Sequence, residues 1–164
     1  MEALITDADA VDAYLAAYAW IKAHPEQHRQ DSWAIQMEGE PQGTDCGTGM
    51  CYAGTTAMLA GARFEFGYSY TTSRCIDAMG YPHDIGTFAA AQLGFHTGAA
   101  IDALEYTLFA AANDMDDIRA WIFVIIGIDP EGEDGWAPSR TWMATNSGMI
   151  NEMATALVMQ DASS

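Results

Sequence analysis

The sequence predicts a mainly α-helical fold of about six helices packed around a small-residue central helix, with a short two-stranded β element. Apolar residues recur at helical spacing along most of the chain, and residues typical of helix caps precede several of these stretches. The alternation typical of strands is confined to two short segments. The chain has 164 residues, 50% of them hydrophobic, which suits a single domain, residues 1–164, around one core.

The first predicted helix lies between Thr6 and Pro25. Thr6 and Asp9 resemble a capping box, with Asp in place of Glu, and Pro25 disfavours helical backbone in the residue before it. The apolar positions between them keep helical spacing; they are Val11, Tyr14, Leu15, Tyr18 and Ile21.

The β element and the central helix are expected between residues 33 and 70. Apolar and polar residues alternate over 33–37 and again over 64–70, and these two segments are expected to form the small sheet. Residues 49–61 are rich in Ala, Gly and Thr, so a helix there lets its neighbours approach closely. This segment is the predicted central helix.

The remaining helices are predicted from their caps. Asp84 is expected to cap a helix that Gly94 ends, and Thr97 to cap the next one. Asn113 or Asp114 is expected to cap a further helix, which stops at Gly127.

The polar composition of residues 129–139 predicts a loop, and the last helix is expected near 147–160. The cap and apolar stripe predicted for that helix are Ser147, Met149, Ile150, Met153, Leu157 and Val158.

The charge of the chain narrows the class of partner. There are 23 Asp and Glu against 6 Lys and Arg, a formal charge of −17, which repels phosphate and anionic lipid. Residues 88–106 have the outline of a helix-turn-helix unit, but its second helix offers Asp102 and Glu105 and no basic residue. Direct binding to nucleic acid or membrane is therefore not expected. The acidity suits solubility, a basic protein partner, or mimicry of nucleic acid.

The sequence also predicts a cytoplasmic location. Its beginning lacks the basic residues and long apolar run of a signal peptide, and the longest apolar run, 120–128, is too short to span a bilayer. Three cysteines are an odd number without the density of a disulfide scaffold.

The most distinctive stretch is residues 45–51, which carries Cys46 and Cys51. If the central helix begins near residue 48, Cys51 lies in its first turn, where the helix dipole lowers a thiol pKa. His83 and Asp84 would then supply a base and its orienting carboxylate for a cysteine nucleophile. The alternatives are packing in the core and redox or disulfide pairing.

The same two cysteines are poor candidates for a zinc site. Cys46 and Cys51 would need Cys75, His83 or His96 to complete four ligands, and no second pair with ligand spacing follows. No metal site and no cofactor are predicted.

Two acidic clusters are the predicted binding residues. They comprise Asp114, Asp116 and Asp117, and then Asp129, Glu131, Glu133 and Asp134, with Trp136 beside the second cluster. Pro130 and Gly132 stand where the calcium loop of an EF-hand has other residues, so calcium binding is not expected. The alternative is that these acids are solvated helix ends, where negative charge suits the helix dipole.

Several short motifs, in their order along the chain, resemble a group of small proteins encoded mostly by actinobacterial phages and related prophages. The motifs cover about residues 20–127 and are His24-Pro25, Trp33, Cys46-Gly47-Thr48-x-x-Cys51-x-Ala53-Gly54, Ala91-x-Leu93-Gly94-Phe95 and Leu108-Phe109. Members of that group often have Trp where this chain has Thr55. The resemblance implies a phage gene expressed in an actinobacterial host, and an accessory role that inhibits a host component.

The function predicted from these features is a non-enzymatic, phage-type accessory protein that binds the basic surface of a host protein through an acidic surface. Host takeover, counter-defence and nucleic-acid mimicry all fit this description. One alternative is a cysteine-dependent enzyme that uses Cys51 or Cys46 with His83. Another is a virion or assembly component. The sequence leaves open whether the chain forms a homo-oligomer.

Overall fold

Six α-helices and two three-stranded antiparallel sheets form the part of the chain that the structure, a computed structural model, describes: residues 2–36 and 48–162. Helices make up 51% of these described residues and strands 11%, so the fold is mixed α/β. The prediction of a mainly α fold with one two-stranded element is therefore wrong. The main reason lies between residues 61 and 84, where four short strands follow one another.

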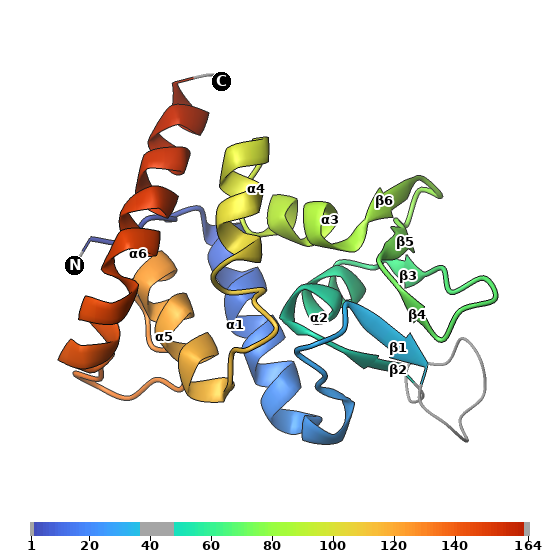
Figure 1. Ribbon diagram of the computed structural model, residues 1–164, viewed down its shortest axis with the longest axis horizontal. Coiled ribbons are helices and arrows are strands. Elements are labelled where there is room, and N and C mark those ends of the chain that lie inside the picture. The colour runs from blue at the N-terminus through green and yellow to red at the C-terminus, as the bar shows by residue number, and fades with distance from the viewer. Residues whose placement is uncertain (1, 37–47, 163–164) are drawn as a thin grey trace.

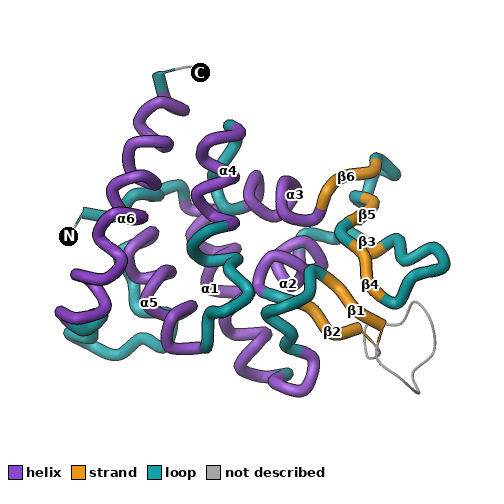
Figure 2. Tube along the Cα trace, viewed as in Figure 1, coloured by secondary structure: helices purple, strands orange, loops and turns teal. Residues whose placement is uncertain are grey.

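The two sheets lie together at one end of the molecule, and helices occupy the rest (Figure 1). α1 (Ala8–Ala23) runs through the middle, and α2 (Tyr52–Leu59) lies between α1 and the sheets. α5 (Met115–Ile126) and α6 (Arg140–Asp161) lie at the end opposite the sheets. Figure 2 shows the same division into a helical half and a strand-containing half.

Two short helices connect these halves. α3 (Ile85–Gln92) begins directly after the last strand, and α4 (Gly98–Glu105) follows it and packs against α6. As predicted, Asp84 caps α3 by accepting a backbone N–H hydrogen bond at 3.1 Å, and Thr97 caps α4. Gly94 has a φ of 88°, which the turn between the two helices requires.

Each sheet has one central strand. In the first sheet, β1 (Ala34–Gln36) lies between β2 (Thr48–Met50) and β4 (Thr71–Thr72). In the second sheet β5 is central, and its strands are β3 (Arg63–Phe64), β5 (Arg74–Ile76) and β6 (Pro82–Asp84). A single turn of 3₁₀ helix, η1 (Pro25–Gln27), follows α1.

The strand expected over residues 33–37 forms as β1, but no single strand spans 64–70. Of that segment only Phe64 lies in a strand, β3, and β1 pairs instead with β4 just after it, although the Gln36 N–H still donates to the Tyr70 carbonyl oxygen at 2.8 Å. Gly67 turns the chain with a φ of 58°, and Tyr68 and Tyr70 are exposed in the loop that follows. The alternation of aromatic residues here therefore belongs to a turn between strands of the two different sheets, β3 and β4.

α2 forms in the predicted small-residue segment but is shorter than expected, because residues 48–50 form β2. It packs mainly against α1 and α3, so the helices are not all arranged around it. All residues from 52 to 57 are buried. The backbone at Trp33 lies directly against Gly54, since a Cβ at this position would overlap the carbonyl oxygen of Trp33. A larger residue at 54 must therefore displace the backbone at Trp33.

Two buried tyrosine hydroxyls join the central helices. Tyr52 Oη donates a hydrogen bond to the Tyr14 carbonyl oxygen at 2.7 Å, and Tyr14 Oη donates to the Leu93 carbonyl oxygen at 3.3 Å. Burial raises the pKa of both hydroxyls, so both remain protonated donors. These bonds satisfy polar groups that would otherwise be buried without partners.

α5 and α6 complete the helical half. Asp114 and Asp117 form a capping box for α5, and Gly127 ends it with a φ of 71°. α6 is capped by Ser139, so it begins earlier than the helix predicted from Ser147. Within residues 2–36 and 48–162, no helix is both long and apolar enough to cross a membrane.

Candidate functional site

The acidic loop after α5, residues 129–139, binds one arginine of that helix, Arg119. Asp129 binds this guanidinium with both carboxylate oxygens, Nε to Oδ1 and Nη2 to Oδ2, each at 2.7 Å. Glu133 and Glu131 approach the same group at 3.0 and 3.3 Å. Because only 11% of the Arg119 side chain and 5% of the Asp129 side chain are exposed, this is a buried, bidentate ion pair.

Trp136 belongs to the same cluster. The guanidinium carbon of Arg119 lies 4.0 Å from the centre of the Trp136 ring, which is a cation–π contact. Phe123 packs edge-on against Trp136, with 5.5 Å between ring centres. Trp136 is half-buried, and its contacts with Arg119 and Phe123 stabilise the loop.

Charge within this loop is compensated by the chain itself. The hydrogen bonds from Arg119 lower the pKa of Asp129. Lys22 and the Tyr18 hydroxyl donate to Glu131 at 2.8 and 2.7 Å, and these two bonds lower the pKa of Glu131. Three of the predicted binding acids, Asp129, Glu131 and Glu133, are therefore held by ion pairs within the chain.

The acidic cluster at the beginning of α5 also serves the fold. Asp114 accepts the Asp117 backbone N–H at 2.9 Å, and the Asp117 carboxylate accepts the Asp114 N–H in return. Asp117 also accepts a hydrogen bond from Trp142 Nε1 at 2.8 Å, which joins α5 to α6. Of the predicted binding acids, Asp116 and Asp134 are exposed without such a bond among the described residues.

Cys51 is the N-cap of α2, and the residue is 2% exposed. Burial raises the pKa of its thiol to about 11. This effect outweighs the backbone N–H groups of the first turn, which lower the pKa as expected at a helix N-terminus. The thiol lies 3.9 Å from the Trp33 carbonyl oxygen. Cys51 is thus a protonated packing residue at neutral pH, whereas Cys46 lies outside the described residues.

His83 is paired with Asp77, a residue that the sequence did not single out. Its Nε2 lies 2.9 Å from Asp77 Oδ2, and this hydrogen bond lowers the pKa of Asp77. The strand register places His83 opposite Cys75, which is buried and whose pKa burial raises to about 11. Among the described residues, no hydrogen bond joins Cys51, His83 and Asp84, so the set predicted with Cys51 is not assembled.

The candidate zinc ligands that the structure describes do not form one group. Cys75 and His83 face each other across β5 and β6, while His96 lies in the turn between α3 and α4. In the described ranges, no group of three or more His, Cys, Asp or Glu side chains is arranged to hold a metal ion.

Two hollows flank the C-terminal half of α6, and neither was predicted. The first, of about 590 Å³, lies between α6, the beginning of α1 and the turn after α3; Asp7, Asp9 and Asp161 line it. The second, of about 520 Å³, is a groove between α4 and α6; Asp102 and Glu152 line it. Five carboxylates therefore line the two hollows, and none of the described Lys or Arg side chains does.

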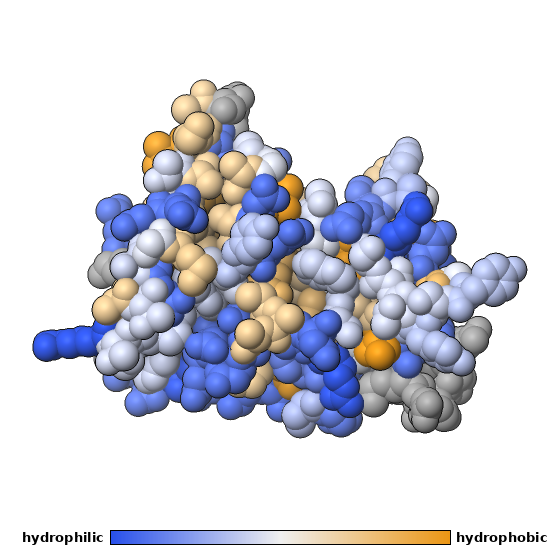
Figure 3. All heavy atoms as spheres, viewed as in Figure 1, coloured by the Kyte–Doolittle hydropathy of each residue, from blue (hydrophilic) through white to orange (hydrophobic). Residues whose placement is uncertain are grey.

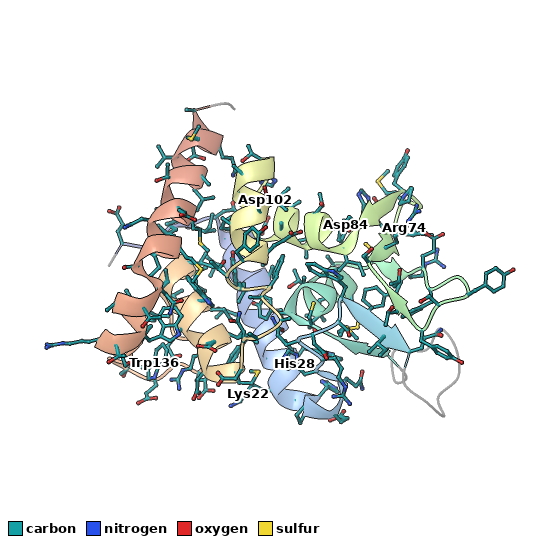
Figure 4. The ribbon with its side chains drawn as sticks, viewed as in Figure 1. Lys22, His28, Arg74, Asp84, Asp102 and Trp136 are labelled. Atoms are coloured by element: carbon teal, nitrogen blue, oxygen red, sulfur yellow. The ribbon has the colours of Figure 1, made fainter. Side chains whose placement is uncertain are left out.

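Apolar side chains are exposed on the same part of the molecule. Val158 and Met159 of α6 are 69% and 63% exposed, and Tyr106 at the end of α4 is 76% exposed. Figure 3 shows hydrophobic residues gathered over the upper parts of α4 and α6. In Figure 4, Asp102 lies on α4, toward the opposite end of the helical half from Trp136. The two hollows and these exposed side chains are called the α6 face below.

The sequence contained one sign of this face. The apolar stripe predicted for the last helix includes both Leu157 and Val158, although adjacent helix positions point about 100° apart. In the structure Leu157 is buried with Met153, and Val158 points away from the core. The sequence signal for this face was therefore an apolar stripe that is too wide for one buried face of a helix.

Comparison with known proteins supplies no relative for this chain. A scan against models of protein families matched none, and searches among curated proteins and among solved structures returned no match. Function is therefore inferred from the geometry and charge of the chain itself.

Proposed function

We infer that this chain is a non-enzymatic accessory protein that binds a basic surface of a partner protein through the α6 face. The observation that carries this inference is that five carboxylates line the two hollows, whereas none of the described Lys or Arg side chains does. Asp7 also caps α1, so the other four are the ones free of a capping role. A surface of one charge sign steers an oppositely charged partner and raises its association rate.

The exposed apolar side chains support the same reading. Met159 lines the groove between α4 and α6, and Val158 beside it on α6 is exposed, so a partner could remove both from water. Interfaces commonly combine such apolar contacts with a charged rim. The clusters predicted from the sequence are weaker candidates, because Asp129, Glu131 and Glu133 are already bound to Arg119.

The resemblance to small phage-encoded proteins supports an accessory role in a host cell, such as inhibition of a host component. Mimicry of nucleic acid is the narrower form of this proposal, in which the partner is a nucleic-acid-binding protein. The alternative of an enzyme that uses Cys51 gains no support, because Cys51 is buried and protonated, and the alternative that uses Cys46 involves a residue outside the described ranges. No feature of the described residues favours a virion component.

The test is affinity capture from an actinobacterial lysate with the tagged chain, at low and at moderate salt. One variant carries Asp9→Lys, Glu152→Lys and Asp161→Lys on the α6 face. A control carries Glu26→Lys, Asp116→Lys and Asp134→Lys at exposed acids elsewhere. Each set places one lysine in the first turn of an α-helix, so the cost to the helix dipole is matched.

The expected result is a partner that wild type and control retain at low salt and that the α6-face variant loses. A partner that only the control loses would move the binding surface to another part of the chain. Absence of any partner at low salt would remove the proposed function.

A further inference from the structure

We propose that the groove between α4 and α6 binds one amphipathic helix of the partner, with an apolar stripe flanked by Lys or Arg. This rests on the proposed function and adds the binding mode. The groove has a volume of about 520 Å³, and both of its walls are helices.

The lining of the groove has the composition of a helix-binding surface. Ala99, Ala103 and Ala156 are small and let a partner approach closely. Met149 and Met159 add flexible apolar side chains, which adapt their shape to what they contact. Grooves that accept the apolar face of an amphipathic helix are built in this way.

The charges in the groove specify the flanks of the partner helix. Asp102 lies on α4 and Glu152 on α6, so each wall supplies one carboxylate. Both residues are exposed, and no Lys or Arg of the described chain lines the groove. A partner helix with a basic residue on each side of its apolar stripe is complementary to this arrangement.

The walls also favour a helix over an extended segment. An extended peptide needs backbone partners, such as the edge of a sheet, because its N–H and C=O groups are unpaired. The backbones of α4 and α6 are paired within their own helices, whereas a partner helix brings its backbone already paired. The lining residues of α6, from 149 to 159, span about 15 Å, which corresponds to about three turns of a partner helix.

A second copy of the chain is a poor occupant. Each copy carries a formal charge of −17, and its α6 face would bring carboxylates against carboxylates. The groove therefore suits a basic helix from another protein.

The experiment is selection of helical peptides on the immobilised full chain. A displayed library of random peptides about 16 residues long is enriched at moderate salt, and the affinities of the recovered peptides are measured by fluorescence anisotropy. The expected peptides carry apolar residues at i, i+3, i+4 and i+7, flanked by Lys or Arg. Ala99→Trp fills the groove, and Ala144→Trp makes the same change at an exposed position of α6 outside it.

Recovered peptides should bind Ala144→Trp like wild type and bind Ala99→Trp at least tenfold more weakly. Asp102→Lys with Glu152→Lys should weaken binding by a similar factor. The proposal is wrong if the peptides bind Ala99→Trp as tightly as wild type. It is also wrong if no peptide is enriched on the wild-type chain over beads coated with Ala99→Trp. A third contradicting result is a dimer of the unbound chain in sedimentation experiments that Ala99→Trp abolishes.

Two further outcomes separate this proposal from the proposed function. If peptides of the same composition in scrambled order bind equally well, charge attraction remains and the helix groove is wrong. If the recovered helices are apolar without basic residues and still need the groove, the preference for a basic partner is wrong and the groove remains.

Discussion

Arg119 and Asp129 form a bidentate pair at 2.7 Å in the acidic loop of a chain whose formal charge is −17. The Trp136 ring stacks on the guanidinium group, with its centre 4.0 Å from the guanidinium carbon. This acidic loop is therefore a structural element held by two cations, Arg119 and Lys22. We propose that the acids that bind a partner lie on the α6 face instead.

Arg119→Met should destabilise the fold by about 3 kcal/mol, because it leaves the buried Asp129 carboxylate without its cation. Arg119→Lys should cost less, since it keeps the charge and loses the bidentate geometry and the stacking. The control is Arg140→Met, at an exposed arginine. Urea denaturation measures these differences. A loss below about 0.5 kcal/mol for Arg119→Met, the range of ordinary surface changes, would contradict this role.

The same pair predicts a dependence of stability on pH. The folded pKa values of Asp129 and Glu131 are lowered, so their contribution is present above the unfolded carboxyl pKa of about 4 and is lost as pH falls through the folded values. The stability difference between wild type and Arg119→Met should therefore be largest near neutral pH and shrink below about pH 4. Urea titrations at several pH values measure it. A difference that is constant with pH would show that the arginine acts through packing alone.

Gly54→Ala should destabilise the protein by about 1–3 kcal/mol, because the new methyl group overlaps the Trp33 carbonyl oxygen. Gly148→Ala is the matched control, since a Cβ at this position of α6 meets no atom within 4 Å. That change should stabilise the helix by about 0.5–1 kcal/mol. Thermal or urea unfolding of both variants tests the pair. Equal effects at the two glycines would argue against the close contact at Gly54.

Cys51 should resist alkylation in the native state. Its pKa is raised to about 11, so the reactive thiolate is rare near neutral pH, and the residue is buried. Iodoacetamide labelling near pH 8, read by mass spectrometry of the Cys51 peptide, should be at least about a hundredfold slower than in the denatured chain. Labelling of native Cys51 at the denatured rate would return the cysteine-enzyme alternative to consideration.

The sequence predicted the features that depend on local backbone. The caps at Asp84 and Thr97 and the stop at Gly127 follow from hydrogen bonds and φ angles within a few residues. The second sheet was missed because its strands have two or three residues, too few for an alternating pattern, and are defined by pairing between distant segments. The beginning of α6 was misplaced because Gly148, a helix breaker in isolation, lies inside the helix.

The candidate site was harder to predict than the fold. The acids at 129–134 were recognised, but their partner is ten residues away on α5, and only folding brings the two together. The sequence contained one sign of this partner, because Arg119 is the sole Lys or Arg between residues 75 and 139. Beyond the wide apolar stripe of the last helix, the α6 face could not be predicted, because it joins the beginning of α1, α4 and the end of α6, which are far apart in sequence.

The most direct test of the central claim is zero-length carbodiimide cross-linking of the chain to the partner captured from lysate, followed by mass spectrometry. The reagent joins carboxylates to amines, and this chain has a single lysine, Lys22, so its carboxylates should couple mainly to lysines of the partner. If the partner binds the α6 face, we expect cross-links at Asp9, Asp102, Glu152 and Asp161. Cross-links confined to Asp116, Asp134 or the strand-containing half would contradict it.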